Sequence, residues 1–125
     1  QKTATISCAG HLPVFHFRAE NHSISEINPK GIAIGMDKGE LFDTHIEELG
    51  VHYQENDLFI FYTDGITEAI NSKNEEYGTE RFKQFILQNH ALSPNEFIEK
   101  LVLEIKKFSR KKKQRDDITL LIVKC

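Results

Sequence analysis

The stretch LFIFYTDGITEA, residues 58–69, decides the fold. It begins with five apolar or aromatic residues, which is typical of a strand in the middle of a core. The strand then runs through a single threonine, Thr63, directly into Asp64 and Gly65. The position of an acidic residue at the end of a buried strand requires an explanation. Gly65 is expected to let the chain turn sharply after it.

A second apolar run, ITLLIV at 118–123, also predicts a buried strand, and Asp116 and Asp117 precede it directly. If the two runs pair in antiparallel fashion, these aspartates converge with Asp64 at one edge of the sheet. Converging carboxylates repel one another unless a cation neutralises them, and oxygen ligands favour a hard ion such as Mg²⁺ or Mn²⁺. Spacing alone leaves an alternative to a metal site open. In that case Asp64 belongs to an ordinary turn, and Asp116 and Asp117 form ion pairs with nearby cations such as Arg115.

The sequence before residue 70 predicts antiparallel strands. Short segments with β-branched residues or alternation are separated by turn residues, which favours antiparallel sheet over strand–helix units. The expected strands are 3–8, 14–18, 23–27, 41–48 and 58–62. The glycine-rich segment GIAIGMDKG, 31–39, neither follows a strand nor opens a helix in the manner of a phosphate-binding loop, so we interpret it as a loop and a candidate flap.

The sequence after residue 70 predicts helices. In ERFKQFILQNH, 80–90, the apolar residues fall on one helical face. A second helix is marked by a capping box of Ser93 and Glu96 with Pro94 at the first helical position. Its apolar stripe is Phe97, Leu101, Ile105 and Phe108. Two helices between two buried strands predict an α+β fold with helices packed on one face of a sheet.

Composition limits the function classes. The chain has 125 residues, 39% of them hydrophobic, and a net charge of −3, which indicates one globular domain and argues against nucleic acid as a partner. The basic run RKKKQR, 110–115, is interpreted as a solvated helix end; its alternative uses are a nucleic-acid patch or the steering of an acidic partner. No apolar run is long enough to cross a bilayer, and Cys8 and Cys125 lack metal-type spacing, so we expect a cytoplasmic protein with reduced thiols.

Four motifs occur in an order that resembles a known family. They are SCAGHLPVFHF (7–17), IAIGM (32–36), DLFIFYTDGITEAIN (57–71) followed by YGTERF (77–82), and QRDDITLLIVK (114–124). Together they resemble the C-terminal part of the SpoIIE and RsbU type of bacterial serine/threonine phosphatase domain, a branch of the metal-dependent phosphatases related to protein phosphatase 2C. The resemblance spans nearly the whole chain.

The resemblance implies a fold and a metal site. In that family an antiparallel β-sandwich flanked by helices, an α-β-β-α arrangement, holds two Mn²⁺ or Mg²⁺ ions at the sheet edge. Asp64 and Gly65 of the TDG motif and Asp116 of the RDD motif would belong to this site. Asp117 stands where larger relatives carry asparagine, so it is either a direct ligand or a support for one. His11, where eukaryotic relatives have an aspartate, either stabilises its loop or takes part in the site.

The resemblance also implies an activity. We expect hydrolysis of phosphoserine or phosphothreonine on proteins by a metal-activated water, with an anti-sigma-factor antagonist as the substrate and a sensor or receiver domain upstream. Relatives place a further metal aspartate before the AGH strand, and no such motif is present here. We therefore expect residues 1–125 to be the C-terminal portion of one phosphatase domain, with little activity alone. The rival interpretation is a non-catalytic interaction domain on the same scaffold.

Overall fold

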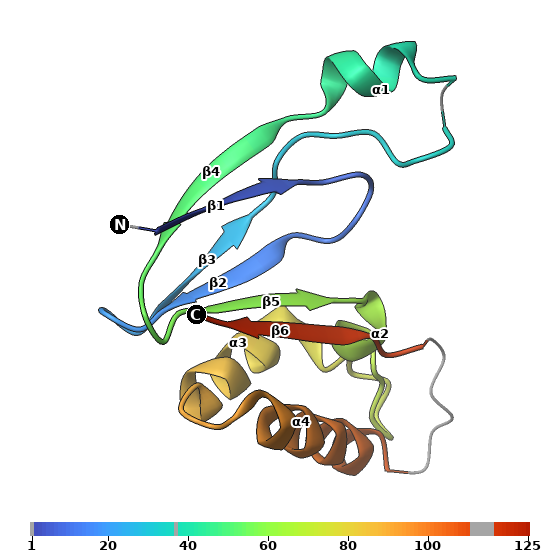
Figure 1. Ribbon diagram of the computed structural model, residues 1–125. Coiled ribbons are helices and arrows are strands. Elements are labelled where there is room, and N and C mark those ends of the chain that lie inside the picture. Colours follow the sequence, from blue (N-terminus) through green and yellow to red (C-terminus); the bar gives the residue numbers. More distant parts are fainter. Residues whose placement is uncertain (1, 37, 111–116) are drawn as a thin grey trace.

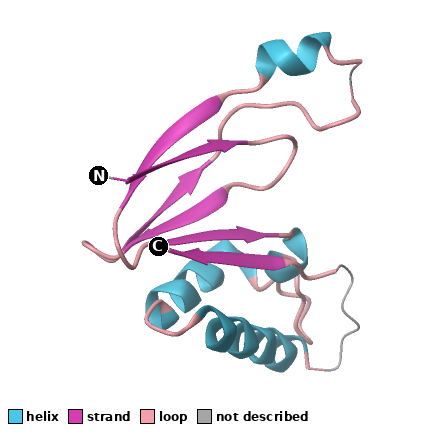
Figure 2. Cartoon of the chain, in the orientation of Figure 1, coloured by secondary structure: helices cyan, strands magenta, loops and turns pink. Residues whose placement is uncertain are grey.

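In the computed structural model, which describes residues 2–36, 38–110 and 117–125, two antiparallel sheets face each other and helices cover the outer face of one of them (Figure 1). The predicted α+β class with an antiparallel sandwich flanked by helices is confirmed. Figure 2 shows the division: the strands form the sandwich, and the two long helices lie together on one side.

The larger sheet has the strand order β3-β2-β5-β6. Its members are β2 (Val14–Arg18), β3 (Ser23–Ile27), β5 (Leu58–Tyr62) and β6 (Leu120–Lys124). The first three match the expected strands, whereas β6 begins two residues later than the apolar run. β5 and β6 pair in antiparallel fashion from Leu58 opposite Lys124 to Tyr62 opposite Leu120, which meets the condition for the aspartates to converge at one sheet edge.

The smaller sheet pairs β1 (Lys2–Ser7) with β4 (Glu48–Tyr53). It packs on the larger sheet through a small apolar cluster of Val14, Ile27, Val51 and Phe59. Val51 comes from β4, while the other three come from the larger sheet. This cluster is the core between the sheets, and it holds the two layers in register.

The main core lies on the other face of the larger sheet, against α3 (Gly78–Asn89) and α4 (Pro94–Ser109). The buried residues of α3 are those of the predicted face: Phe82, Phe85, Ile86 and Asn89. In α4 the predicted stripe is buried at Phe97, Leu101 and Ile105. The capping box is also present, because Ser93 accepts the Glu96 N–H while the Glu96 carboxylate accepts from the Ser93 N–H.

The prediction of a strand at 41–48 is wrong. Residues Glu40–His45 form a short helix, α1, and the strand β4 starts only at Glu48. α1 buries none of its residues, so no packed face imposed a period on its sequence. Gly39 precedes the helix with φ 118°, and the acids Glu40 and Asp43 occupy its first turn, where the helix dipole favours them. In the part of the chain that is described, no helix is long and apolar enough to cross a membrane.

The strand directions gather several loops at one end of the sandwich (Figure 1). β5 ends there and β6 begins there, and the antiparallel pairing of β2 with β3 and β5 brings the start of β2 and the end of β3 to the same end. The loops 8–13 and 28–36 are in close contact: a Cβ on Gly31 would lie 1.7 Å from the Cys8 carbonyl oxygen. Only glycine permits this approach.

Candidate functional site

The carboxyl end of β5 and the segment leading into β6 lie side by side at this end of the sandwich. The β5–β6 ladder ends with Tyr62 opposite Leu120. One residue further on, the Thr63 N–H donates to the Thr119 carbonyl at 3.1 Å. The pairing therefore continues up to the residue that precedes Asp64, and it brings the Asp64 and Asp117 segments to the same sheet edge.

The Thr63 side chain adds two hydrogen bonds between the same two segments. Its hydroxyl donates to the Asp117 carbonyl at 2.9 Å and accepts from the Thr119 N–H at 2.9 Å. Sequence reasoning missed this role, because it treated Thr63 only as the end of the strand. The signal was present: a threonine directly follows one apolar strand, and another lies at the start of the other.

Asp64 is the first residue of α2 (Asp64–Thr67), and its side chain is exposed. Gly65 follows it inside the helix and is buried. The chain does turn sharply here, since the Ile66 N–H donates to the Thr63 carbonyl at 3.2 Å, but Gly65 lies within the helix and positive φ occurs at other glycines, including those at positions 10, 35, 39 and 78. A buried glycine has no side-chain ligand, so Gly65 can offer an ion only its carbonyl oxygen.

Asp117 is exposed, and its main chain is bound to Thr63. Within the described ranges, neither Asp64 nor Asp117 has a hydrogen bond or ion pair through its carboxylate, so both sets of oxygens are open to a ligand. Asp116 and most of the basic run 110–115 lie outside the described residues. Among the residues that are described, no three His, Cys, Asp or Glu side chains form a group that could hold a metal.

His11 lies in the loop between β1 and β2, at the same end of the sandwich as Asp64. The β2–β5 pairing ends with Phe15 opposite Ile60, and His11 and Asp64 lie beyond it at the same end of the two strands. The imidazole is exposed, with Nδ1 2.9 Å from the Leu12 carbonyl, and the Cys8 thiol donates to the carbonyl of His11 at 3.2 Å. These bonds hold the loop together. Cys8 and Cys125 are both free thiols.

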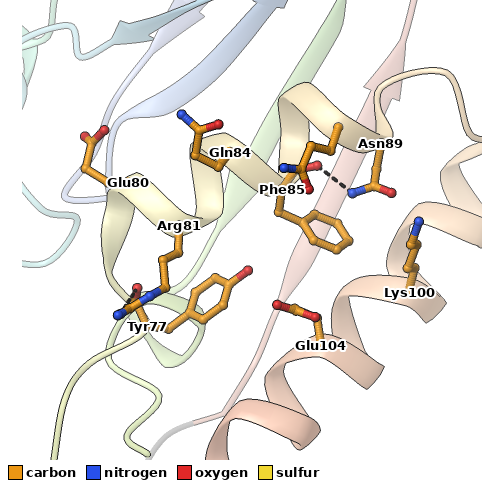
Figure 3. A pocket seen from close by; sticks show the side chains of 9 residues that line it. Tyr77, Glu80, Arg81, Gln84, Phe85, Asn89, Lys100 and Glu104 are labelled. Atoms are coloured by element: carbon orange, nitrogen blue, oxygen red, sulfur yellow. Dashed lines mark hydrogen bonds between the residues drawn. The ribbon is translucent and has the colours of Figure 1, made fainter.

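A groove of about 440 Å³ lies elsewhere, between α3 and α4 (Figure 3). Its lining has mixed charge and includes Glu80, Arg81, Lys100 and Glu104, but neither Asp64 nor Asp117. Arg81 is already engaged, because it donates to the carbonyls of Glu76 and Tyr77. Burial, and then the negative charge of Glu104, raise the pKa of Tyr77 to about 12. Two lining residues that could act chemically are therefore in use: Arg81 is bound to main-chain carbonyls, and Tyr77 keeps its proton at neutral pH.

A buried pair at the opposite end of β5 was also missed. His16 and Asp57 are 0% and 3% exposed, and His16 Nε2 lies 3.0 Å from Asp57 Oδ2. The carboxylate also accepts from the N–H groups of Ala19 and Gln54. The sequence placed His16 on one face of its strand, but alternation cannot reveal a partner that is 41 positions away. This pair therefore has a structural role, because it links β2 to the start of β5.

The comparisons with known proteins agree with this architecture. The sequence matches the family described as Stage II sporulation protein E (SpoIIE) over residues 1–125. It is 21% identical over 123 residues to phosphoserine phosphatase RsbU of Bacillus subtilis, covering 96% of this chain and 34% of that protein. The chain thus spans about a third of the length of this curated relative.

Two solved structures share the fold. The SiaA-PP2C domain of Pseudomonas aeruginosa superposes with a TM-score of 0.75 at 19% identity, covering 92% of this chain and 44% of that one. A manganese-presoaked phosphatase domain of SpoIIE from Bacillus subtilis gives a TM-score of 0.66 at 20% identity, covering 98% and 50%. The sequence match over all 125 residues, on a fold of this type, establishes that the chain belongs to the SpoIIE family.

Proposed function

We propose that this chain is part of a metal-dependent protein serine/threonine phosphatase that acts in bacterial signalling. The observation that carries the proposal is the hydrogen bond from the Thr63 hydroxyl to the Asp117 carbonyl. Because Thr63 directly precedes Asp64, this bond joins the Asp64 segment to the Asp117 segment at one sheet edge. Two exposed carboxylates, both without a protein partner among the described residues, stand on segments that are fixed by the main chain. Membership of the SpoIIE family supports the reaction class.

The donor chemistry fits divalent metal ions. Asp64 and Asp117 offer only oxygen, and neither histidine nor cysteine joins them in the described ranges, so the set suits Mn²⁺ or Mg²⁺ rather than a softer ion. Asp116 and the Gly65 carbonyl are the further candidate ligands of this chain, and His11 is a candidate neighbour. When bound, such ions supply Lewis-acid activation of water and of the phosphate oxygens.

The part played by the chain itself is positioning. β5 is buried at Leu58, Phe59 and Ile60, and Tyr62 is 5% exposed, so the strand that carries Asp64 has little freedom. The carboxylate at its end would therefore be presented at a fixed place to a metal ion. A ligand held in this way needs little reorganisation when the ion binds, and the positive charge of the bound ion would lower the barrier to hydrolysis.

We further propose that residues 1–125 are the C-terminal portion of a single phosphatase domain. Two ions need more oxygen ligands than the carboxylates of this chain provide. The chain covers 44% and 50% of the two solved phosphatase chains, which supports the same division. The remaining ligands would come from the rest of the domain, and residues 1–125 alone would have little or no activity.

The substrates and surroundings belong to the same proposal. The similar protein from Bacillus subtilis is named a phosphoserine phosphatase. We propose phosphoserine or phosphothreonine in a protein as the substrate here, with an anti-sigma-factor antagonist as the specific candidate. A sensor or receiver domain upstream and a cytoplasmic location complete the proposal.

The test uses the whole protein, with Asp64→Asn and, as control, Glu99→Gln on the exposed side of α4. Mn²⁺ binding is measured by calorimetry, and release of phosphate is measured from a phosphoserine protein. Removing the carboxylate is expected to lower activity by more than about 100-fold, because charge stabilisation by the ions is worth several kcal/mol. Glu99→Gln should leave both measurements unchanged.

The rival, a non-catalytic interaction domain on the same scaffold, predicts a different result. In that case the whole protein would release no phosphate at any Mn²⁺ concentration, and Asp64→Asn would leave Mn²⁺ binding unaltered. Equal Mn²⁺ affinity in wild type and variant would remove Asp64 from the metal site.

A further inference from the structure

The Thr63 hydroxyl both donates and accepts a hydrogen bond, and both bonds join it to a segment 54 to 56 positions away in sequence. It has one proton, which it donates to the Asp117 carbonyl at 2.9 Å, and it accepts the Thr119 N–H at 2.9 Å. The Thr63 N–H makes a third bond, to the Thr119 carbonyl at 3.1 Å. The side chain therefore extends the β5–β6 ladder past its last strand pair.

These bonds lie where the two segments separate. β6 pairs with β5 only as far as Leu120, and at Asp64 the chain turns into α2. Within the described ranges, the hydrogen bonds between 63–69 and 117–119 all involve Thr63. A main-chain bond alone would fix Thr119 but would leave Asp117 free to move away from Asp64.

We infer that Thr63 is a positioning residue that fixes the spacing of the two candidate metal-binding segments. This inference rests on the proposed phosphatase function. Thr63 is next to Asp64 in sequence, and its hydroxyl donates a hydrogen bond to the main chain of Asp117. The separation of the two carboxylates then depends on one side chain that touches neither ion nor substrate.

Threonine suits this role better than its close analogues. Its β-branch restricts χ1 and favours extended backbone, so the hydroxyl is held toward the neighbouring segment. Serine keeps both hydrogen bonds but loses the restriction. Valine keeps the shape and the β-branch and loses both bonds. The series Thr63, Thr63→Ser, Thr63→Val therefore separates the hydrogen bonds from the shape.

The experiment measures Mn²⁺ binding to the whole protein by calorimetry, with phosphatase activity as a second readout. Loss of a hydrogen bond that orients a ligand typically weakens metal affinity by about 10–100-fold, so Thr63→Val should raise the Kd for Mn²⁺ by that factor. Much of its activity should return when Mn²⁺ is raised to saturation. Thr63→Ser should stay close to wild type. Thr5→Val, the same change at an exposed position of β1, should alter nothing.

Hydrogen exchange of the Thr119 amide gives a readout that is independent of metal and activity. In the metal-free wild type this amide should be protected, and Thr63→Val should expose it. Unprotected exchange in wild type would overturn the inference even if Thr63→Val failed to fold. Wild-type Mn²⁺ affinity in Thr63→Val, or a loss in Thr63→Ser as large as in Thr63→Val, would also overturn it. Absence of Mn²⁺ binding to wild type would instead overturn the proposed function.

Discussion

At the scale of single residues, the two ends of β5 are held by different chemistry. At the end that leads to Asp64, Thr63 makes hydrogen bonds to the segment before β6. At the other end, Asp57 directly precedes the strand, and its carboxylate is buried against His16. His16 also stacks on Phe59, with ring centroids 4.5 Å apart. Its Nε2–H faces the Asp57 carboxylate, which can only accept, while its Nδ1 is buried without a hydrogen-bond partner among the described residues. Asp57 thus joins β2, β5 and two turns at one point.

Asp57→Asn should therefore destabilise the protein. In either orientation the new amide NH₂ would face an N–H donor, that of Ala19 or those of His16 and Gln54, and breaking a buried pair of this kind costs about 3 kcal/mol. Chemical denaturation at pH 7 measures the change in the free energy of unfolding. Asp43→Asn, at an exposed position of α1, should change it by less than about 0.5 kcal/mol. Equal effects of the two substitutions would show that the pair adds no stability.

The same pair gives a pH dependence with a definite sign. Burial alone would raise the pKa of Asp57, but bonds from the Ala19 and Gln54 N–H groups and from His16 outweigh it and hold the pKa below its ordinary value of 3.8. A lowered pKa contributes stability that is complete above pH 3.8 and is lost as the pH falls through the folded-state value. Denaturation of wild type and Asp57→Asn should therefore give a constant stability difference at higher pH and a shrinking one below pH 3.8. A difference that grew on acidification would contradict this.

At the scale of elements, α4 shows how packing decides which side of a helix matters. Leu101 is 1% exposed and belongs to the main core, whereas Leu103 is 56% exposed on the same helix. The two residues have the same intrinsic helix propensity, so substitutions at these positions differ only in burial. The helix is also fixed at its start by the capping box of Ser93 and Glu96.

Leu101→Ala should lower the free energy of unfolding by about 3 kcal/mol, because it removes buried methyl groups and leaves a cavity. Leu103→Ala should stay within about 0.5 kcal/mol of wild type. Denaturant titration of both variants checks the pair. A comparable loss at Leu103 would mean that this exposed face is covered by another part of the protein.

The elements also show where sequence reasoning succeeded. The face of α3 and the stripe and cap of α4 followed from apolar periodicity and one cap motif, which are local signals, whereas the pairing of β5 with β6 was a supposition that the structure bears out. The helix α1 was mistaken for a strand because it buries nothing. At the site, antiparallel pairing predicted that Asp64 and Asp117 share an edge. The bonds of Thr63 depend on the register one residue beyond the ladder, which periodicity does not specify.

At the scale of the whole molecule, the sandwich is unevenly covered. The sheet of β1 and β4 has only two strands, while the sheet it packs on has four. β6 is an edge strand whose Leu120 and Ile122 pack on the helical core, yet Leu121 and Val123 are 57% and 44% exposed. A two-stranded sheet is marginal by itself in water. These features support the proposal that further strands of the same domain cover this face.

The proposal predicts that Leu121 is shielded in the whole protein. With Cys8 and Cys125 replaced by serine, Leu121→Cys should react with a maleimide at least about 10-fold more slowly than Leu103→Cys, because labelling would need local opening of the sandwich. The two leucines are almost equally exposed here, at 57% and 56%, so unequal rates must come from residues beyond this chain. Mass spectrometry of timed samples gives both rates, and denaturant should make them equal. Equal rates in the native protein would show that β6 presents an open face and that the phosphatase domain is completed elsewhere.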